Sequence, residues 1–143
     1  FLERGRIVET DPRVPPEGRL DLVSFRGAPV EETLSRRGLR AAYGGDEPDV
    51  VEIARRARNG DRRATDVLRS FGSTLGEFLT PWLERFDPTC LVLGGSIARS
   101  WDLWAAEFRA ACAPAARLYT CDVATYLEEA PLLGAAYHAS RAD

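Results

Sequence analysis

A short apolar run that ends in two glycines constrains this chain more than any other feature of its sequence. The run, Cys90–Leu93, is bounded by Pro88 before it and by Gly94-Gly95 after it. Four apolar residues between such breakers are typical of a strand buried on both faces of a sheet. Ser96 follows and is a residue type that caps helices. The sequence therefore predicts a strand, a glycine turn and a helix in direct succession, the unit from which α/β domains are built.

An apolar stripe at helical spacing precedes this strand. Apolar residues recur at every third or fourth position from Ala64 to Leu83, a pattern that no strand would show. Asp61 can cap the helix at its start, and Asp87-Pro88 closes it. Pro81 predicts a bend, because proline removes one helix hydrogen bond and crowds the preceding turn.

Weaker patterns predict the remaining elements of the chain. They are a hairpin at 1–8, a proline-rich loop at 10–18, a short strand at 20–25, a helix at 29–42 ended by Gly44-Gly45, a helix from Pro48-Asp49 to Asn59-Gly60, a strand at 118–121 and a closing helix at 131–139. This order predicts an α/β domain with a mixed, partly parallel sheet and flanking helices.

The totals exclude several classes of function. The 143 residues suit one domain, and the net charge of −3 offers no basic footprint, so we expect no nucleic-acid binding through this segment. The three cysteines are odd in number and lack C-x-x-C spacing, which indicates neither a disulfide framework nor a zinc cluster. Apolar runs fall short of the roughly 20 residues of a membrane helix. We expect a soluble, cytoplasmic protein.

The glycine turn is the strongest candidate for a binding site. Ligands of open α/β sheets bind at the carboxyl ends of the strands. Gly94 and Gly95 would let a ligand approach the backbone, and a helix start offers free N–H groups to a phosphate or ribose oxygen. Turns of this kind also occur simply because the chain must reverse tightly, so the turn alone leaves a purely structural role open.

Four segments, in the same order, resemble the ROK family (repressor, open reading frame, kinase). Residues 1–8 resemble the hairpin that follows that family's second phosphate loop, a Gly-Thr-Gly turn. Residues 30–39 are similar to its Leu-Glu-x-Tyr-x-Ser-Gly-Arg-Ala-Leu segment, and residues 87–96 to its Asp-Pro-x-x-Ile-Val-Leu-Gly-Gly-Gly. Residues 130–136 resemble its closing Ala-x-Leu-Leu-Gly-Ala-Ala helix.

The resemblance implies a ribonuclease H-like domain of the actin-like ATPase and hexokinase type. In that family two lobes hold ATP with Mg²⁺ and a hexose-type sugar between them. Residues 1–143 would be the C-terminal lobe, with the N-terminal lobe absent from this chain. Gly94 and Gly95 would face the adenosine and its phosphates, with Ser96 beside them. Gly44-Gly45 is a weaker candidate for the nucleotide pocket, its other interpretation being a plain helix C-cap.

Two departures from the family pattern bear on catalysis. Active members carry Glu-x-Gly-His and a zinc cluster where residues 10–21 here contain neither His nor Cys, so we expect no zinc. Glu17 is either a remnant of the sugar contact or part of a solvated turn. The family's catalytic Asp belongs to the other lobe, so we expect no catalytic residue in this chain, and whether the whole protein is an enzyme stays open.

Three functions fit this pattern. The first is the nucleotide-binding half of an ATP-dependent hexose kinase, which is a transferase. The alternatives are a sugar-responsive transcription regulator and a non-catalytic family member. Trp101 and Trp104 lie three apart on one predicted helix face and are either packing or interface residues, and with the family's habit they favour a homodimer. His138, the one histidine, is expected to have a structural role at or near the surface.

Overall fold

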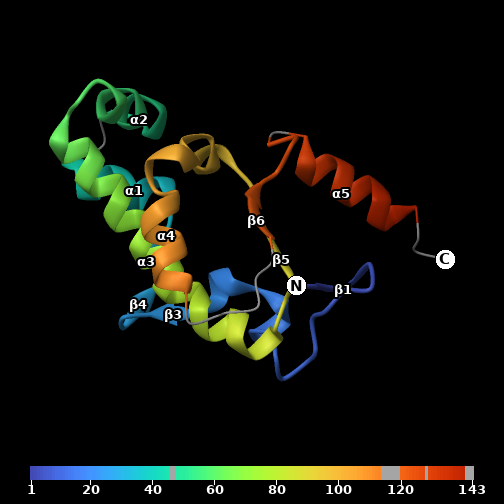
Figure 1. The fold of residues 1–143 in the computed structure, drawn as a ribbon. Helices are drawn as coiled ribbons and strands as arrows, with labels where there is room; N and C mark the ends of the chain where they lie inside the picture. Colours follow the sequence, from blue (N-terminus) through green and yellow to red (C-terminus); the bar gives the residue numbers. More distant parts are fainter. Residues whose placement is uncertain (46–47, 114–119, 128, 141–143) are drawn as a thin grey trace.

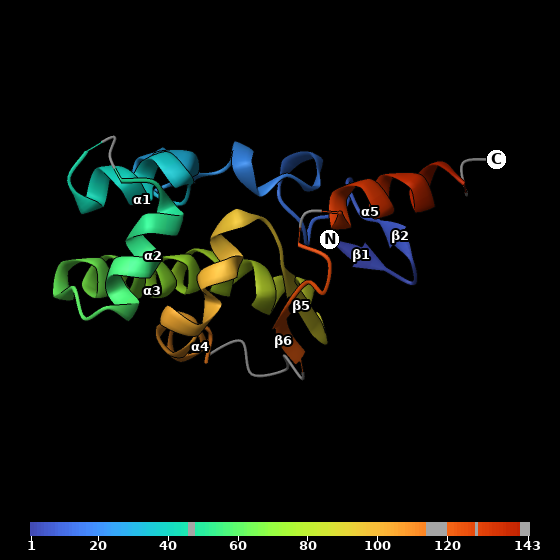
Figure 2. The ribbon, with the colours of Figure 1, turned by 90° about the horizontal axis from the view of Figure 1, so that it is seen from above.

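The structure is a computed structural model that describes residues 1–45, 48–113, 120–127 and 129–140. Its arrangement is α/β, with a helical core on one side of a short parallel strand pair and a lone helix on the other (Figures 1 and 2). The core consists of four helices: α1 (Arg36–Tyr43), α2 (Val50–Arg58), α3 (Arg62–Phe86) and α4 (Ala105–Cys112).

Helix α3 forms the spine of this core, as the apolar stripe predicts. The Asp61 carboxylate accepts a hydrogen bond from the Ala64 N–H at 3.1 Å and another from the Tyr43 hydroxyl at 2.8 Å. The helix continues through Pro81 and ends at Asp87, which adopts a left-handed conformation with φ of 55°. The predicted start and end are therefore confirmed, while the bend at Pro81 stays a prediction.

Two glycines on α3 let α4 approach it closely. Gly72 and Gly76 lie one turn apart and are buried against α4 and the residue before it. A methyl group at Gly76 would come within 2.8 Å of the Phe108 carbonyl oxygen, and one at Gly72 within 2.5 Å of the Trp104 carbonyl oxygen. Phe108 itself is fully buried beneath this contact. The close approach thus depends on the absence of side chains on α3.

The tryptophan pair packs within this chain, with Trp104 in the core and Trp101 half-buried against it. Trp104 is only 2% exposed and stacks edge-to-face on Trp101, Phe71 and Phe108. The segment after Ser96 is not one helix: a 3₁₀ helix, η4 (Ser96–Leu103), gives way to α4 at Trp104, whose φ of −138° breaks the helical path. The homodimer itself stays a prediction.

Three two-stranded sheets occur in the described part of the chain. Strands β5 (Cys90–Leu93) and β6 (Thr120–Val123) pair in parallel, whereas the pairs β1 (Leu2–Glu3) with β2 (Arg6–Ile7) and β3 (Ser24–Phe25) with β4 (Ala28–Pro29) are antiparallel. Both kinds of pairing were expected, and the first hairpin is confirmed. Strand β6 lies two residues beyond its predicted place, and positions 118 and 119 fall outside the described residues.

The expectation that β5 is buried on both faces was wrong. Leu91 and Leu93 face the helical core, whereas Cys90 and Val92 are exposed, Val92 by 61%. Within the described residues β5 pairs with β6 alone, so only one face of this pair is covered by helices. Apolar content therefore overstated the burial of the strand.

Two predicted elements before α2 are shorter than expected. The strand predicted at 20–25 is a 3₁₀ turn, η2 (Leu20–Leu22), followed by β3. The helix predicted at 29–42 begins only at Arg36, because Ala28–Pro29 pairs with β3 and Val30–Glu32 forms a 3₁₀ turn, η3. Ser35 is the true cap and accepts a hydrogen bond from the Gly38 N–H at 3.0 Å. The predicted helix α2 is confirmed, and the Asp49 side chain caps it by accepting a hydrogen bond from the Val50 N–H.

The closing helix α5 (Ala130–Ala139) is also confirmed. It lies beside the β1–β2 hairpin and projects away from α1–α4 (Figure 2). All residues from Leu132 to Ser140 are exposed, including His138. In the described residues no helix is long and apolar enough to span a membrane.

Candidate functional site

The candidate site lies where both parallel strands end. Leu93 pairs with Val123 at the last rung of the ladder, and the Ala124 N–H donates to the Leu93 carbonyl oxygen at 2.8 Å. Beyond this rung the chain leaves β5 toward η4 and leaves β6 toward α5 (Figure 1). Two loops therefore diverge from one sheet edge, the position at which open α/β sheets bind ligands.

The glycine turn at this edge is open on its outer side. A Cβ atom built on Gly94 or on Gly95 would meet no other atom within 4 Å. Gly95 has φ of 83°, a left-handed conformation that favours glycine, and all three of Gly94, Gly95 and Ser96 are exposed. The turn therefore needs glycine for its conformation at Gly95, while the empty space beside both residues admits a ligand against the backbone.

Backbone donors follow directly after the turn. The first hydrogen bond of η4 runs from the Ala98 N–H to the Gly95 carbonyl oxygen at 3.1 Å, which places the amides of Ser96 and Ile97 ahead of the bonded run. Ser96 was expected to cap this helix, but Gly95 occupies the cap position and no side-chain cap bond forms. The Ser96 hydroxyl is thus not engaged in capping and lies exposed beside the turn.

The second loop contributes two residues that the sequence did not reveal. Thr125 and Tyr126 follow β6 and are both exposed, Tyr126 by 61%. Their hydroxyl and aromatic groups are suited to a ribose oxygen and a planar base, respectively. With β6 predicted two residues early, this loop was not recognised as the carboxyl end of a strand. Recognising that the two strands pair in parallel would have identified this loop, because parallel pairing brings both carboxyl ends to one edge of the sheet.

Glu17 lies in a different part of the fold. It is exposed within a 3₁₀ turn, η1 (Pro16–Gly18), at φ of 58°, and no hydrogen bond among the described residues joins it to the glycine turn. The loop around it is fixed by Arg13, which pairs with Asp11 at 2.9 Å and with Glu3 at 3.3 Å. The hydrogen bond from Arg13 also lowers the pKa of the Asp11 carboxyl. The sugar contact of Glu17 stays a prediction.

Gly44 ends α1, as its C-cap interpretation predicts. Its N–H donates to the carbonyl oxygens of Arg40 and Ala41, both at 3.1 Å, and its φ is 130°. A Cβ at Gly44 would approach the Arg63 guanidinium to 2.8 Å. This surrounding space is filled, unlike the space beside Gly94. Within the described ranges no three His, Cys, Asp or Glu side chains gather as a metal site would require.

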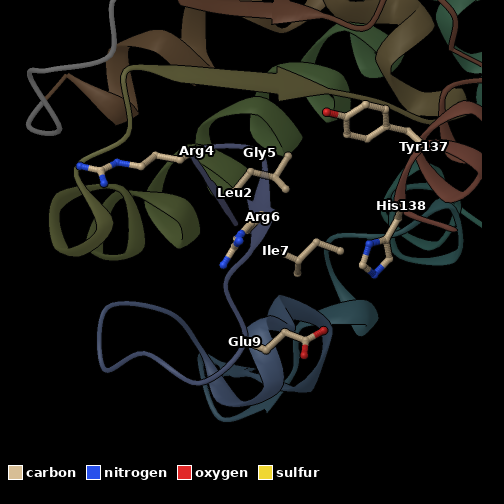
Figure 3. A pocket seen from close by; sticks show the side chains of 9 residues that line it. Leu2, Arg4, Gly5, Arg6, Ile7, Glu9, Tyr137 and His138 are labelled. Carbon is tan, nitrogen blue, oxygen red and sulfur yellow. The ribbon is translucent and has the colours of Figure 1, made fainter. Parts of the chain in front are cut away.

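Two cavities have linings that do not include the glycine turn. One of about 510 Å³ lies between α1 and α3 and includes Leu39, Arg63 and Phe71 in its lining. The other, of about 770 Å³, lies between the β1–β2 hairpin and α5 (Figure 3).

Comparison with known proteins identifies the family of this chain. The sequence model of the ROK family matches residues 24–142, so the chain belongs to the ROK family. A crystal structure of a "putative sugar kinase" from Cytophaga hutchinsonii shares the fold with a TM-score of 0.74 and 22% sequence identity. The match covers 89% of this chain but 50% of that one, so this chain spans about half the length of that solved structure. No curated protein matches significantly.

Proposed function

We propose that this chain is the nucleotide-binding half of an ATP-dependent hexose kinase, with a ribonuclease H-like fold and with MgATP as its ligand. The observation that carries this proposal is the open glycine turn at the carboxyl edge of β5 and β6, where the space beside Gly94 and Gly95 is empty. The ROK membership and the shared fold support the kinase class. The second lobe, with the catalytic base, would have to come from outside this chain.

Each residue of the site has a defined task in this proposal. The amides after Gly95 donate to phosphate or ribose oxygens, because a helix start concentrates partial positive charge there. Ser96 and Thr125 offer hydroxyl groups from the two loops, and Tyr126 offers a ring for the base. Such a site would contribute binding and positioning, which supply most of the catalysis in phosphoryl transfer, while proton removal falls to the other lobe.

One observation favours the alternatives, a sugar-responsive regulator or a non-catalytic member. The segment in which active members keep their sugar-binding and zinc motifs is here a compact turn, with Val14 and Pro15 buried and Arg13 held by two carboxylates. A segment so arranged offers neither an imidazole nor a thiolate to a ligand.

Nucleotide titration of matched glycine variants tests the proposal. Gly95 and Gly27 share φ of 83° and open surroundings, so Gly95→Asp and Gly27→Asp carry the same backbone strain and add the same charge. A carboxylate about 4 Å from a phosphate costs roughly 4 kcal/mol near a protein surface before screening. We therefore expect Gly95→Asp to weaken MgATP binding at least about tenfold, while Gly27→Asp leaves it unchanged.

Calorimetric titration of the chain with MgATP, and separately with hexoses, gives the readout. Equal loss in both variants, or no MgATP binding by the parent chain, would refute the nucleotide site. Hexose binding without nucleotide binding would instead support the regulator.

A further inference from the structure

The turn that joins α2 to α3 holds the one side-chain amide of the sequence (Figure 1). The 143 residues include no Gln and a single Asn, Asn59, which is followed by Gly60. A side-chain carboxamide reacts with the main chain most readily in an Asn-Gly pair, because glycine places no side chain beside the attacking backbone nitrogen. Such a reaction is therefore confined to one position of this chain.

The side chain of Asn59 is exposed and unengaged. Asn59 is the C-cap residue of α2, and within the described ranges its carboxamide forms no hydrogen bond. Gly60 is exposed as well, with φ of 91°, and a Cβ atom built on it would meet no other atom within 4 Å. Water and hydroxide therefore have access to both residues.

Backbone hydrogen bonds at the end of α2 restrain this pair. The Gly60 N–H donates to the Ala57 carbonyl oxygen at 3.0 Å, and the Asp61 N–H donates to the Arg56 carbonyl oxygen at 3.0 Å. The Gly60 nitrogen must lose its proton before it can attack the Asn59 side chain, so the first of these bonds has to open. Helix ends open at little cost in free energy, and the loss of one such bond slows the reaction roughly fivefold. The fold thus slows the reaction without preventing it.

We propose that Asn59 is a site of spontaneous covalent modification, at which its carboxamide becomes a carboxylate. After losing its proton to hydroxide, the Gly60 nitrogen forms a bond to the Asn59 γ-carbon, and the carbon–nitrogen bond of the carboxamide breaks to release ammonia. Water then opens the resulting five-membered imide ring. Opening at the γ-carbon leaves aspartate, whereas opening at the backbone carbonyl carbon leaves isoaspartate, whose main chain runs through the γ-carbon. The net reaction consumes one water, releases one ammonia and needs no oxidant or reductant.

The products differ in their effect on the junction between α2 and α3. Both place a carboxylate at the negative end of the α2 dipole, which is unfavourable. Isoaspartate also lengthens the main chain by one carbon, which displaces the N–H groups of Gly60 and Asp61 from their acceptors on α2. Asp61 caps α3 and accepts a hydrogen bond from the Tyr43 hydroxyl, so the disturbance extends to the start of α3. The modification is independent of nucleotide binding.

Peptide mass spectrometry of the full chain, incubated at pH 8, tests the proposal. We expect residue 59 to gain the mass that replacement of NH₂ by OH produces, and in heavy-oxygen water to gain one heavy oxygen atom. The formal net charge changes from −3 to −4, which isoelectric focusing resolves. A synthetic peptide of residues 56–62 gives the rate without the fold, and the folded chain should react roughly fivefold more slowly. A folded chain that keeps its carboxamide long after the peptide has reacted completely would overturn the proposal.

Asn59→Gln is the matched control for the chemistry. It keeps a carboxamide at the end of α2, but attack by the next backbone nitrogen would have to close a six-membered ring, which forms far more slowly. We expect this variant to show no change in charge over the same period. An equal change in charge in the variant and the parent chain would place the reaction elsewhere and contradict the assignment to Asn59.

Thermal unfolding separates the two products. Asn59→Asp has the aspartate product with its ordinary main chain, and ion exchange isolates the isoaspartate form from the incubated parent chain. We expect the isoaspartate form to unfold at a lower temperature than Asn59→Asp, since it alone displaces the N–H groups of Gly60 and Asp61. Equal midpoints would contradict the proposed effect on the junction.

Discussion

Gly72 and Gly76 of α3 form a glycine seam against α4, and a side chain added to this seam should destabilise the core. In Gly76→Ala the new methyl carbon would lie 2.6 Å from the Ala111 Cβ and 2.8 Å from the Phe108 carbonyl oxygen, whereas ordinary contacts begin near 3.4 Å. One obstacle is backbone and the other is the first carbon of a side chain on a packed helix, so neither can rotate away. Helix α4 must therefore move by several tenths of an ångström.

Two opposing effects set the change in unfolding free energy of Gly76→Ala. Overpacking of a core typically costs about 1–3 kcal/mol, and the rigid obstacles place this site toward the upper end. Alanine in place of a mid-helix glycine returns roughly 1 kcal/mol through helix propensity. The expected net loss is about 1–2 kcal/mol, which corresponds to a fall of roughly 4–8 °C in the thermal midpoint for a domain of this size.

Thermal and urea unfolding followed by circular dichroism measure this loss. Gly134→Ala is the matched control, because a Cβ there meets nothing within 4 Å and only the propensity gain applies. We expect Gly134→Ala to be neutral or slightly stabilising. A Gly76→Ala variant as stable as the parent would show that α4 yields without cost and that the seam does not limit the core.

Two further predictions concern ionisable groups. Hydrogen bonds from Arg55 and then Arg56 lower the pKa of Glu52 from 4.5 to about 2, so the stability they add is present above the ordinary pKa and lost as the pH falls from about 4.5 to about 2. The thermal midpoint of Glu52→Gln should therefore change less with pH in this window than that of the parent chain. If the two proteins show the same pH dependence, the assigned role of Glu52 is refuted. Burial raises the pKa of the Cys112 thiol to about 11, whereas Cys90 is exposed. A thiol reagent at pH 8 should react first with Cys90, so Cys90→Ser removes the fast phase, and its persistence would contradict the structure.

Local signals in the sequence predicted the helical part of the fold well. The start of α3 was predictable because Asp61 caps the helix through its own neighbours, and the end because Asp87-Pro88 stops it. The start of α2 was predictable in the same way, from Pro48-Asp49. These contacts span four residues or fewer, so residue type and spacing suffice to identify them.

Contacts between distant segments could not be predicted in this way. The burial of β5 depends on which strands and helices lie beside it, and its apolar sequence does not contain that information. The glycine seam requires α4 to cross α3 at Gly72 and Gly76, which no local pattern reveals. Whether Trp104 packs within the chain or faces a partner depends on the helices beside it, and the structure places it against Phe71 and Phe108.

The candidate site illustrates both cases within one sheet edge. Gly94 and Gly95 could be identified from the sequence because a breaker after an apolar run marks a strand end, whereas Thr125 and Tyr126 became visible only through the register that pairs Leu93 with Val123. The same loop leads into α5. Gly95→Asp should weaken nucleotide binding, while Leu133→Asp, at an exposed position of α5, should leave nucleotide binding intact. A Leu133→Asp variant that lost nucleotide binding would indicate that the loop couples α5 to the glycine turn.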